Sequence, residues 1–200
     1  MQAELFLDTS TPQGLLALRL VTGEVIERLI PAGAHSSHAL LPSIQDLLQE
    51  KQIELKNLSR ILCGIGPGSY TGIRVAVTIA SSLAFGLDRA WAGLPSLLLW
   101  PPQQPGRFFA LLDARSGGVY ALAAEWNGEQ GTILLAPQRL SIEDFLKQSH
   151  HLNIHHLVTP DLEKIQRRVP SSFSIEAAAP SSRWIWKAPA SLQQSTVHYG

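Results

Sequence analysis

The stretch that decides the fold of this chain is Ile61-Leu62-Cys63-Gly64-Ile65-Gly66-Pro67-Gly68-Ser69-Tyr70-Thr71-Gly72-Ile73-Arg74. A short apolar strand enters a glycine-rich turn, and the turn leads into a helix. Glycines allow positive φ angles and close backbone approach, so consecutive N–H groups could line an anion site at the positive end of the helix dipole. A tight strand-to-helix turn capped by Ser69 or Thr71 explains the same residues without a ligand.

Three familiar catalytic loops do not match this stretch. In a Walker loop, Lys and Ser or Thr would follow the last glycine, but Ile73 and Arg74 follow Gly72. The glycine spacing also differs from the dinucleotide-binding fingerprint, and the turn has one residue too many for a nucleophile elbow. A phosphate site here would therefore lack the Lys and the Ser or Thr hydroxyl that a Walker loop supplies.

The elements around this stretch predict an α/β fold. The expected elements are, in order, strands Glu4–Asp8, Gly14–Leu20 and Glu24–Ile30, a helix over Ser37–Leu48, strand Leu58–Gly64 and a helix over Ile73–Leu87. Pro42 should kink the first helix or delay its start. Three strands, a helix, a strand and a helix are typical of a ribonuclease-H-like lobe, in which helices cover a sheet.

A second lobe should follow the proline-rich break at Pro95–Pro105, so we expect one lobe over residues 1–105 and another over 106–200. Its expected elements are a hairpin of Arg107–Asp113 and Gly118–Trp126, a short helix capped by Ser141, and a strand over Ile154–Val158. After Pro170 the pattern dissolves into Ser, Ala and Pro. We therefore predict a smaller, incomplete second lobe.

Composition and charge narrow the functional classes. The chain has 200 residues, 45% of them hydrophobic, and 16 Lys and Arg balance 16 Asp and Glu. A neutral chain does not suit an independent nucleic-acid binder. Cys63 is the only cysteine, which excludes an internal disulfide, and the sequence shows neither a secretory signal nor an apolar run of membrane length. We expect a soluble cytoplasmic protein.

A polar turn ends the first strand. The carboxylate and hydroxyls of Asp8-Thr9-Ser10-Thr11 could project toward a cleft and hold a metal–phosphate unit. Such residues also commonly satisfy the backbone groups of a turn, which is the alternative interpretation. The candidate phosphate or nucleotide site, which we interpret as vestigial, consists of Asp8, Thr9, Ser10, Gly66, Gly68, Ser69, Thr71 and Gly72.

The helix after the glycine turn carries no charge from Val75 to Leu87. A helix that is apolar all round must be covered all round, and its small residues would let another helix approach closely. We favour a subunit interface over an ordinary central helix, and a homodimer is plausible. The expected interface residues are Leu40, Leu41, Ile44, Leu48, Arg74, Val77, Ala80, Ser81 and Ala84.

The histidines do not assemble a ligand set. His35 and His38 lie one helical turn apart, but no third ligand is near them in sequence. Four more, at positions 150, 151, 155 and 156, fall in expected loops. We interpret these histidines as solvated or capping side chains and predict no metal site.

Four segments resemble the TsaB (YeaZ) family in order and spacing, namely Leu5–Ser10, His35–Pro42, Gly64–Arg74 and Asp113–Tyr120. The run from Gly66 to Arg74 is the most specific of them. The resemblance implies an actin-like, two-lobed ASKHA fold and a role in making threonylcarbamoyl-adenosine beside the tRNA anticodon. It also implies a structural role for the family motif residues Asp113, Arg115 and Tyr120.

Members of that family are non-catalytic partners of the related enzyme TsaD. TsaD carries a metal-binding His pair after the helix that follows its own glycine loop, whereas Trp91–Trp100 here contains no His, Asp, Glu or Cys. The resemblance therefore implies a scaffold that needs no cofactor of its own and docks a TsaD-like subunit through Ser37–Leu48 and Ile73–Leu87. It also implies a TsaE-like ATPase as a second partner, ATP held mainly by the partner, tRNA contact only through the complex, and no membrane contact.

Two other functions stay open. Asp8 and the glycine loop could belong to a residual ATP-binding or ATP-hydrolysing protein. A remnant metallopeptidase is less favoured, because the residues that would bind its metal are missing from the expected segment.

Overall fold

The structure is a computed structural model that describes residues 2–11, 13–30, 36–114 and 117–194. It divides into two compact units. One unit contains the residues up to Ser96 together with the segment that starts at Pro189, and the other is Leu97–Ala188. The chain thus changes unit earlier than the expected boundary between residues 105 and 106. The return of the C-terminal segment to the first unit is a non-local feature that no sequence pattern signals.

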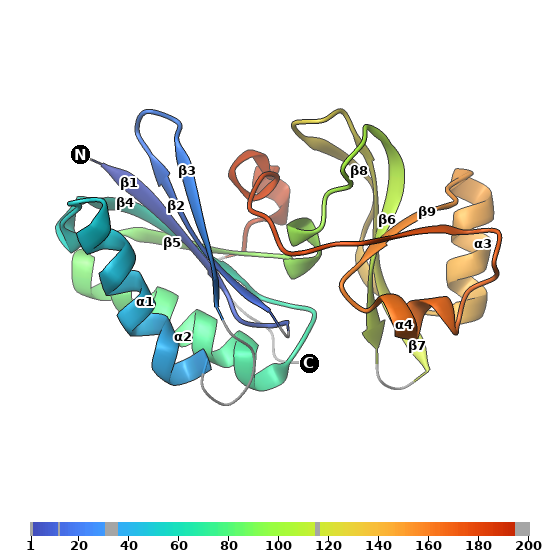
Figure 1. Cartoon of the computed structure of the whole chain (residues 1–200), viewed down its shortest axis with the longest axis horizontal. Coiled ribbons are helices and arrows are strands. Elements are labelled where there is room, and N and C mark those ends of the chain that lie inside the picture. Colours follow the sequence, from blue (N-terminus) through green and yellow to red (C-terminus); the bar gives the residue numbers. More distant parts are fainter. Residues whose placement is uncertain (1, 12, 31–35, 115–116, 195–200) are drawn as a thin grey trace. The chain divides into compact units, whose positions relative to one another are not determined.

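The first unit is built on a five-stranded mixed sheet (Figure 1). Its strands are β1 (Ala3–Asp8), β2 (Gly14–Leu20), β3 (Val25–Ile30), β4 (Leu58–Gly64) and β5 (Ala90–Leu94), in the spatial order β3-β2-β1-β4-β5. β1 pairs antiparallel with β2 and parallel with β4, and β4 pairs parallel with β5. This topology confirms the predicted ribonuclease-H-like order and adds β5, which the sequence pattern does not reveal.

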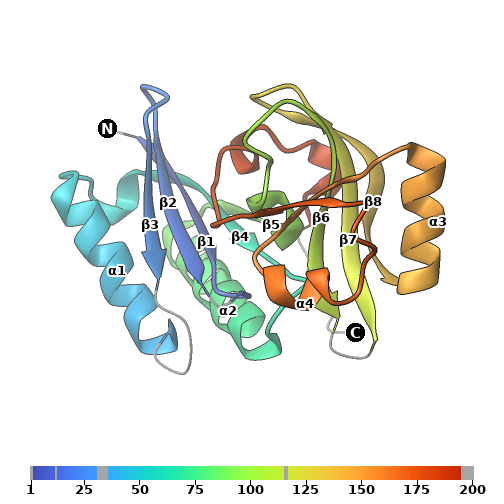
Figure 2. The same cartoon turned by 45° about the vertical axis from the view of Figure 1, so that its right-hand side comes forward.

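Two helices, α1 (Ser36–Glu50) and α2 (Tyr70–Leu87), cover one face of this sheet (Figures 1 and 2). Leu5 and Leu7 of β1 form one core cluster with Ile44 of α1 and Ala80 of α2. Alternate residues of a strand point to the same face, so the apolar residues of β1 meet the apolar sides of both helices. Pro42 lies inside α1 without delaying its start.

The second unit repeats the same strand order. Its strands are β6 (Gly106–Ala114), β7 (Gly118–Trp126), β8 (Gly131–Ser141), β9 (His156–Thr159) and β10 (Ser174–Ala177), in the order β10-β9-β6-β7-β8. The α-helices of this unit are α3 (Ile142–Leu152) and α4 (Leu162–Gln166). The expectation of an incomplete second lobe is therefore wrong for the sheet, because β8 and β10 complete it.

Several strands and helices of the second unit are short. β9 and β10 have four residues each and α4 has five. Beyond Pro170 the regular elements of the described residues are β10 and the 3-10 turns Ile185–Lys187 and Ala190–Leu192. Two further 3-10 turns, Leu55–Asn57 and Ser96–Leu99, lie earlier in the chain. Phe109 and Phe145 meet edge to face, with ring centroids 5.2 Å apart, in the core that α3 covers.

Candidate functional site

Asp8 is fully buried at the end of β1, and both of its carboxylate oxygens have partners inside the first unit. The backbone N–H of Ser10 donates to Asp8 Oδ1 at 2.6 Å, and the Ser96 hydroxyl donates to Asp8 Oδ2 at 2.5 Å. A buried carboxylate is tolerated only when donors replace the water that it has lost. Asp8 therefore acts as an internal anchor for these two segments.

Ser96 links the end of β1 to the glycine turn. Its Oγ accepts hydrogen bonds from the N–H of Gly66 at 3.0 Å and from the Ser10 hydroxyl at 2.9 Å, while it donates to Asp8. The N–H of Ser96 also donates to the Gly66 carbonyl at 2.7 Å. One donor and two acceptor positions exhaust the capacity of a hydroxyl. Nothing local in the sequence marks Ser96, which lies 88 residues from Asp8.

The glycines of the turn make room for the polar residues that end β1. A Cβ on Gly64 would overlap the Asp8 carboxylate, one on Gly72 would overlap the Thr9 carbonyl, and one on Gly68 would overlap the Ser10 carbonyl. These three glycines are therefore needed for the close approach of the end of β1 to the turn.

Hydroxyl groups complete the packing of the turn. The Thr9 hydroxyl donates to the Gly72 carbonyl at 2.7 Å. Ser69 is the N-cap of α2, and its Oγ accepts from the Gly72 N–H at 3.3 Å, as its capping role predicts. The structure therefore brings together seven of the eight predicted site residues, and Thr71 makes none of these contacts. Gly68, Ser69 and Thr71 are exposed, and the other five are buried.

Burial raises the pKa of Asp8 above its usual value of 3.8, and the hydrogen bonds from Ser10 and Ser96 oppose that rise. The folded chain then binds a proton at Asp8 more tightly than the unfolded chain does. The contribution of Asp8 to the free energy of unfolding is accordingly largest at low pH and decreases as the pH rises above about 4.

Asp8→Asn tests this titration. We expect the free energy of unfolding of the wild type, minus that of Asp8→Asn, to fall as the pH rises from about 3 to about 7, because only the wild type has this group to ionise. Urea unfolding followed by circular dichroism at each pH measures the difference. A difference that rises with pH would mean that the folded state prefers the charged carboxylate.

A second carboxylate ends the first strand of the second unit. Asp113 of β6 forms an ion pair with Arg168 at 2.9 Å, and its N–H donates to Asp161 Oδ2 at 3.2 Å. Arg168 also donates to the Gly118 carbonyl at 3.1 Å. These contacts support a structural role for Asp113. Tyr120 is half-buried on β7, and Arg115 lies outside the described residues.

Most of the predicted interface residues face inward. Those that are buried are Leu40, Ile44, Leu48, Val77, Ala80 and Ala84. All six belong to the core of the first unit, because the apolar stripes of α1 and α2 pack on their own sheet. The prediction that these six residues contact a partner is therefore wrong. Leu41 and Arg74 are exposed and Ser81 is half-buried, so these three remain accessible.

The side of α2 away from the sheet is not covered by the chain's own fold, so a subunit interface on this side stays a prediction. Its 18 residues are long and apolar enough to span a membrane, with 28% of them buried. The expectation that the sequence contains no apolar run of membrane length is therefore wrong for this stretch. Ala76 and Ala80 place the inner side of α2 in the core, whereas Phe85 on the outer side is 91% exposed. α2 is a core helix with an uncharged outer surface.

The histidines stay scattered. His38 is exposed on α1, and His35 lies outside the described residues. Over the described part of the chain, the side chains of His, Cys, Asp and Glu form no group of three or more that could hold a metal ion. Cys63 is buried, as expected for a small apolar residue, and burial raises the pKa of its thiol.

Comparison with known sequences finds relatives that are named for tRNA modification. A family model described as TsaD, tRNA N6-adenosine threonylcarbamoyltransferase, matches residues 29–187. The tRNA threonylcarbamoyladenosine biosynthesis protein TsaB of Escherichia coli K12 is 32% identical over 110 residues, which cover 50% of this chain and 48% of that protein. TsaB of Bacillus subtilis 168 is 32% identical over 116 residues, covering 56% and 50%. The chain spans about half the length of these curated relatives.

Two solved structures from Pseudomonas aeruginosa have the same fold. A protein described as similar to the peptidase YeaZ gives a TM-score of 0.76 at 26% identity and covers 90% of this chain and 86% of its own. YeaZ from the same organism gives 0.73 at 25% identity with the same coverage. The predicted two-lobed α/β fold is confirmed.

Proposed function

The chain belongs to the TsaB (YeaZ) family, which is related to the TsaD transferases, and from this premise we propose that it is a non-catalytic subunit of a tRNA-modifying complex. In this role it is a scaffold or activator for a TsaD-like catalytic subunit, which transfers a threonylcarbamoyl group to the tRNA adenosine next to the anticodon. A TsaE-like ATPase is the second partner, and tRNA is reached through the complex in the cytoplasm.

The observation that carries this proposal is the internal use of both strand-end carboxylates. Ser96 and the Ser10 N–H occupy the two oxygens of Asp8, and Arg168 neutralises Asp113. A carboxylate that positions a metal–phosphate unit must be open to the ion, whereas Asp8 is fully buried and the Asp113 side chain is 8% exposed. These side chains instead hold the chain's own segments, which supports a structural part in the complex.

The same contacts weigh against the alternative of an ATP-hydrolysing protein. The polar end of β1 packs directly against three glycines of the turn, so we propose that ATP, where the complex needs it, is held mainly by the partner. No arrangement of the described side chains favours the metallopeptidase alternative. The chain itself requires no cofactor in this proposal.

Reconstitution of the transfer reaction tests the function. We expect threonylcarbamoyl-adenosine to form in tRNA when the TsaD-like and TsaE-like subunits are mixed with this chain, and to drop to background when the chain is left out. Mass spectrometry of tRNA nucleosides measures the product. Asp8→Asn chain that is folded by circular dichroism should support transfer as the wild type does. Transfer that does not need the chain would refute the role, and abolished transfer with Asp8→Asn would indicate catalysis by Asp8.

Docking is expected on the outer sides of α1 and α2. Leu41 is 45% exposed, and Arg74 is exposed near the start of α2. Leu41→Glu would place a charge in an apolar contact, where an unpaired charge is costly to desolvate. We expect it to weaken binding of the TsaD-like subunit about tenfold or more in calorimetry. The same surface could pair two copies of the chain when the partner is absent.

Val21→Glu is the matched control for this prediction. Val21 is an aliphatic residue, 72% exposed in the turn between β2 and β3, and it belongs to neither helix. The control should bind the TsaD-like subunit with wild-type affinity. Equal affinities for wild type, Leu41→Glu and Val21→Glu would place the docking surface elsewhere.

A further inference from the structure

The C-terminal segment, residues 189–194, covers part of the edge of the first sheet. The N–H of Gly93 donates to the Gln194 carbonyl at 2.6 Å, and the N–H of Gln194 donates to the Gly93 carbonyl at 2.9 Å. Two residues that exchange both bonds form the hydrogen-bonded pair of an antiparallel ladder. β5 is the last strand of its sheet, so Gln194 lies where a further strand would be added.

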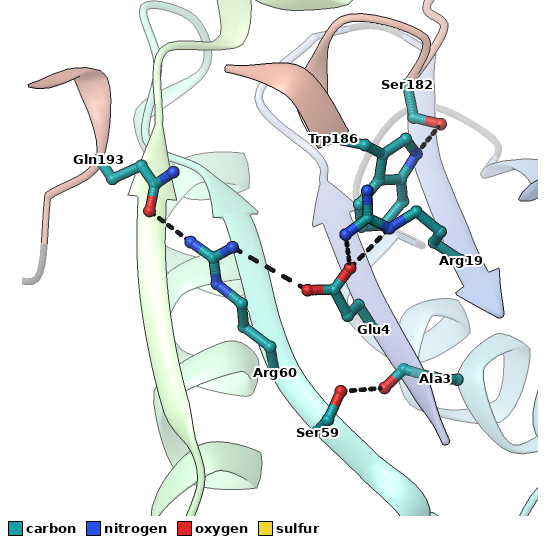
Figure 3. Close-up of polar contacts among 8 residues, drawn as sticks. All are labelled: Ala3, Glu4, Arg19, Ser59, Arg60, Ser182, Trp186 and Gln193. Atoms are coloured by element: carbon teal, nitrogen blue, oxygen red, sulfur yellow. Dashed lines mark hydrogen bonds and ion pairs between the residues drawn. The ribbon is translucent and has the colours of Figure 1, made fainter. Parts of the chain in front are cut away.

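A side chain also ties this segment to the sheet. Arg60 of β4 donates to the Gln193 side-chain carbonyl, and its other terminal nitrogen lies 3.9 Å from Glu4 Oε1 (Figure 3). Glu4 in turn accepts from Arg19 Nε at 2.6 Å. A row of charged side chains on β2, β1 and β4 thus ends on Gln193.

The attachment of the segment is shallow. Within residues 189–194, Leu192 and Gln193 are half-buried and the others are exposed. Burial of apolar surface is the dominant favourable term in folding, and segments that have little of it open by local unfolding. The net contribution of each hydrogen bond is small, because water replaces it on release. We therefore expect the segment to leave the edge readily.

β5 itself lacks the side chains that commonly protect an edge strand. Its residues, Ala90–Leu94, include no charge and no proline. β3, at the opposite edge of the same sheet, carries Glu27 and Arg28. An uncharged edge strand pairs easily with another strand, and natural proteins often cover such an edge with a loop. The C-terminal segment is placed to serve as that cover.

The register of β5 makes the strand complementary to a second copy of itself. Successive residues of a strand turn their N–H and C=O groups to opposite sides, so Leu94, which accepts from the Ile65 N–H at 3.0 Å, faces β4. By the same alternation, Gly93 and Trp91 face the edge. A two-fold axis at Ala92 would place each Trp91 opposite Gly93 of the other copy, with the backbone groups of both facing one another. The indole would then meet the Ile65 side chain, which lies over Gly93.

We propose that the C-terminal segment is a releasable cover on the edge of β5, and that its release lets two copies of the chain join their first sheets edge to edge. In the joined form the segment and everything after it have left both edges, and Ala92 meets Ala92 of the other copy. Trp91 of the other copy takes over the two backbone bonds that Gln194 makes to Gly93. Cover and second copy use the same N–H and C=O groups, so each excludes the other. This inference does not depend on the scaffold role, which uses the outer sides of α1 and α2.

The test uses the full chain with both ties of the cover weakened. Gln193→Ala removes the side-chain acceptor of Arg60, and Gln194→Pro removes the N–H that bonds Gly93. Gln194→Ala keeps both ties and is the matched control. Every variant also carries Leu41→Glu, which removes the other proposed contact between copies. Analytical ultracentrifugation measures association, and we expect the double variant to dimerise with a dissociation constant about tenfold or more below that of the control.

Charges at position 92 identify the surface that pairs. Like charges directly opposite one another destabilise a pair of strands, whereas opposite charges stabilise it. In the double variant we therefore expect Ala92→Lys alone and Ala92→Glu alone to be monomeric, and an equimolar mixture of the two to form a heterodimer. Circular dichroism of each variant checks that it is folded before mixing.

Two results would overturn the proposal. The first is a double variant that associates no more tightly than Gln194→Ala, because the segment would then not control association. The second is a dimer that persists with Ala92→Lys, or folded Lys and Glu variants that stay monomeric when mixed, because the two copies would then not meet at Ala92. The scaffold role is measured separately by tRNA modification and would survive either result.

Discussion

Replacing Gly64 with alanine is expected to lower the free energy of unfolding by about 3 kcal/mol or more. The new Cβ would lie 1.6 Å from Asp8 Oδ2, so either the strand or the carboxylate must move. A move of Asp8 also breaks its bonds to Ser10 and Ser96 inside the core, which adds the cost of unsatisfied buried polar groups. Urea unfolding of wild type and variant, followed by circular dichroism, measures the loss.

Gly86→Ala is the control for this prediction. Gly86 is in α2, and a Cβ there would meet no atom within 4 Å. Alanine is the better helix former, so the variant should be about 0.5 kcal/mol more stable than the wild type. If Gly64→Ala were as stable as Gly86→Ala, the close approach of Asp8 to the glycine turn would not exist in solution.

Ser96→Ala is expected to cost about 3 kcal/mol of unfolding free energy. The substitution leaves Asp8 Oδ2 without its hydroxyl donor and the Gly66 N–H without its acceptor, and each orphaned buried group costs about 1–3 kcal/mol. We expect the substitution to destabilise the whole glycine turn, because Ser96 connects the turn to β1. The midpoint of urea unfolding and amide exchange at Gly66 measure it.

Ser10→Ala separates the role of Ser96 from that of its neighbour. This control removes the hydroxyl that donates to Ser96 but keeps the Ser10 N–H on Asp8 Oδ1, so it should cost only about 1 kcal/mol. The ordering of the two variants is the informative result. A loss in Ser96→Ala no larger than that in Ser10→Ala would show that Ser96 is not the central residue of this cluster.

The regular strands could be predicted closely from the sequence. β2, β4 and β7 have the expected bounds, because each is a mostly apolar run between turn signals. β5 and β8 escape the same pattern: β5 is a five-residue run with an internal glycine, and β8 contains Pro137 and has an irregular register with β7. Their place in the sheets depends on neighbouring strands more than on their own residues.

Most residues of the candidate site could be predicted from the sequence, but the structural role of its glycines could not. The pattern groups Asp8 with the glycine turn, as the structure does, but it does not reveal that the glycines allow the close approach of β1. The predicted interface residues show what apolar periodicity leaves open. Periodicity identifies Ile44 and Ala80 as residues that must be buried, but it does not say whether a partner or the chain's own sheet buries them.

The sequence by itself determined the family, the two-lobed α/β class and the order of most elements, because glycine turns, caps and apolar periodicity act over a few residues. Only the tertiary structure decided how Asp8 is satisfied, since its donor Ser96 lies 88 residues away. The pairing of Gln194 with Gly93 was decided in the same way. Contacts between distant residues are selected by the packing of whole sheets, and no local pattern carries that information.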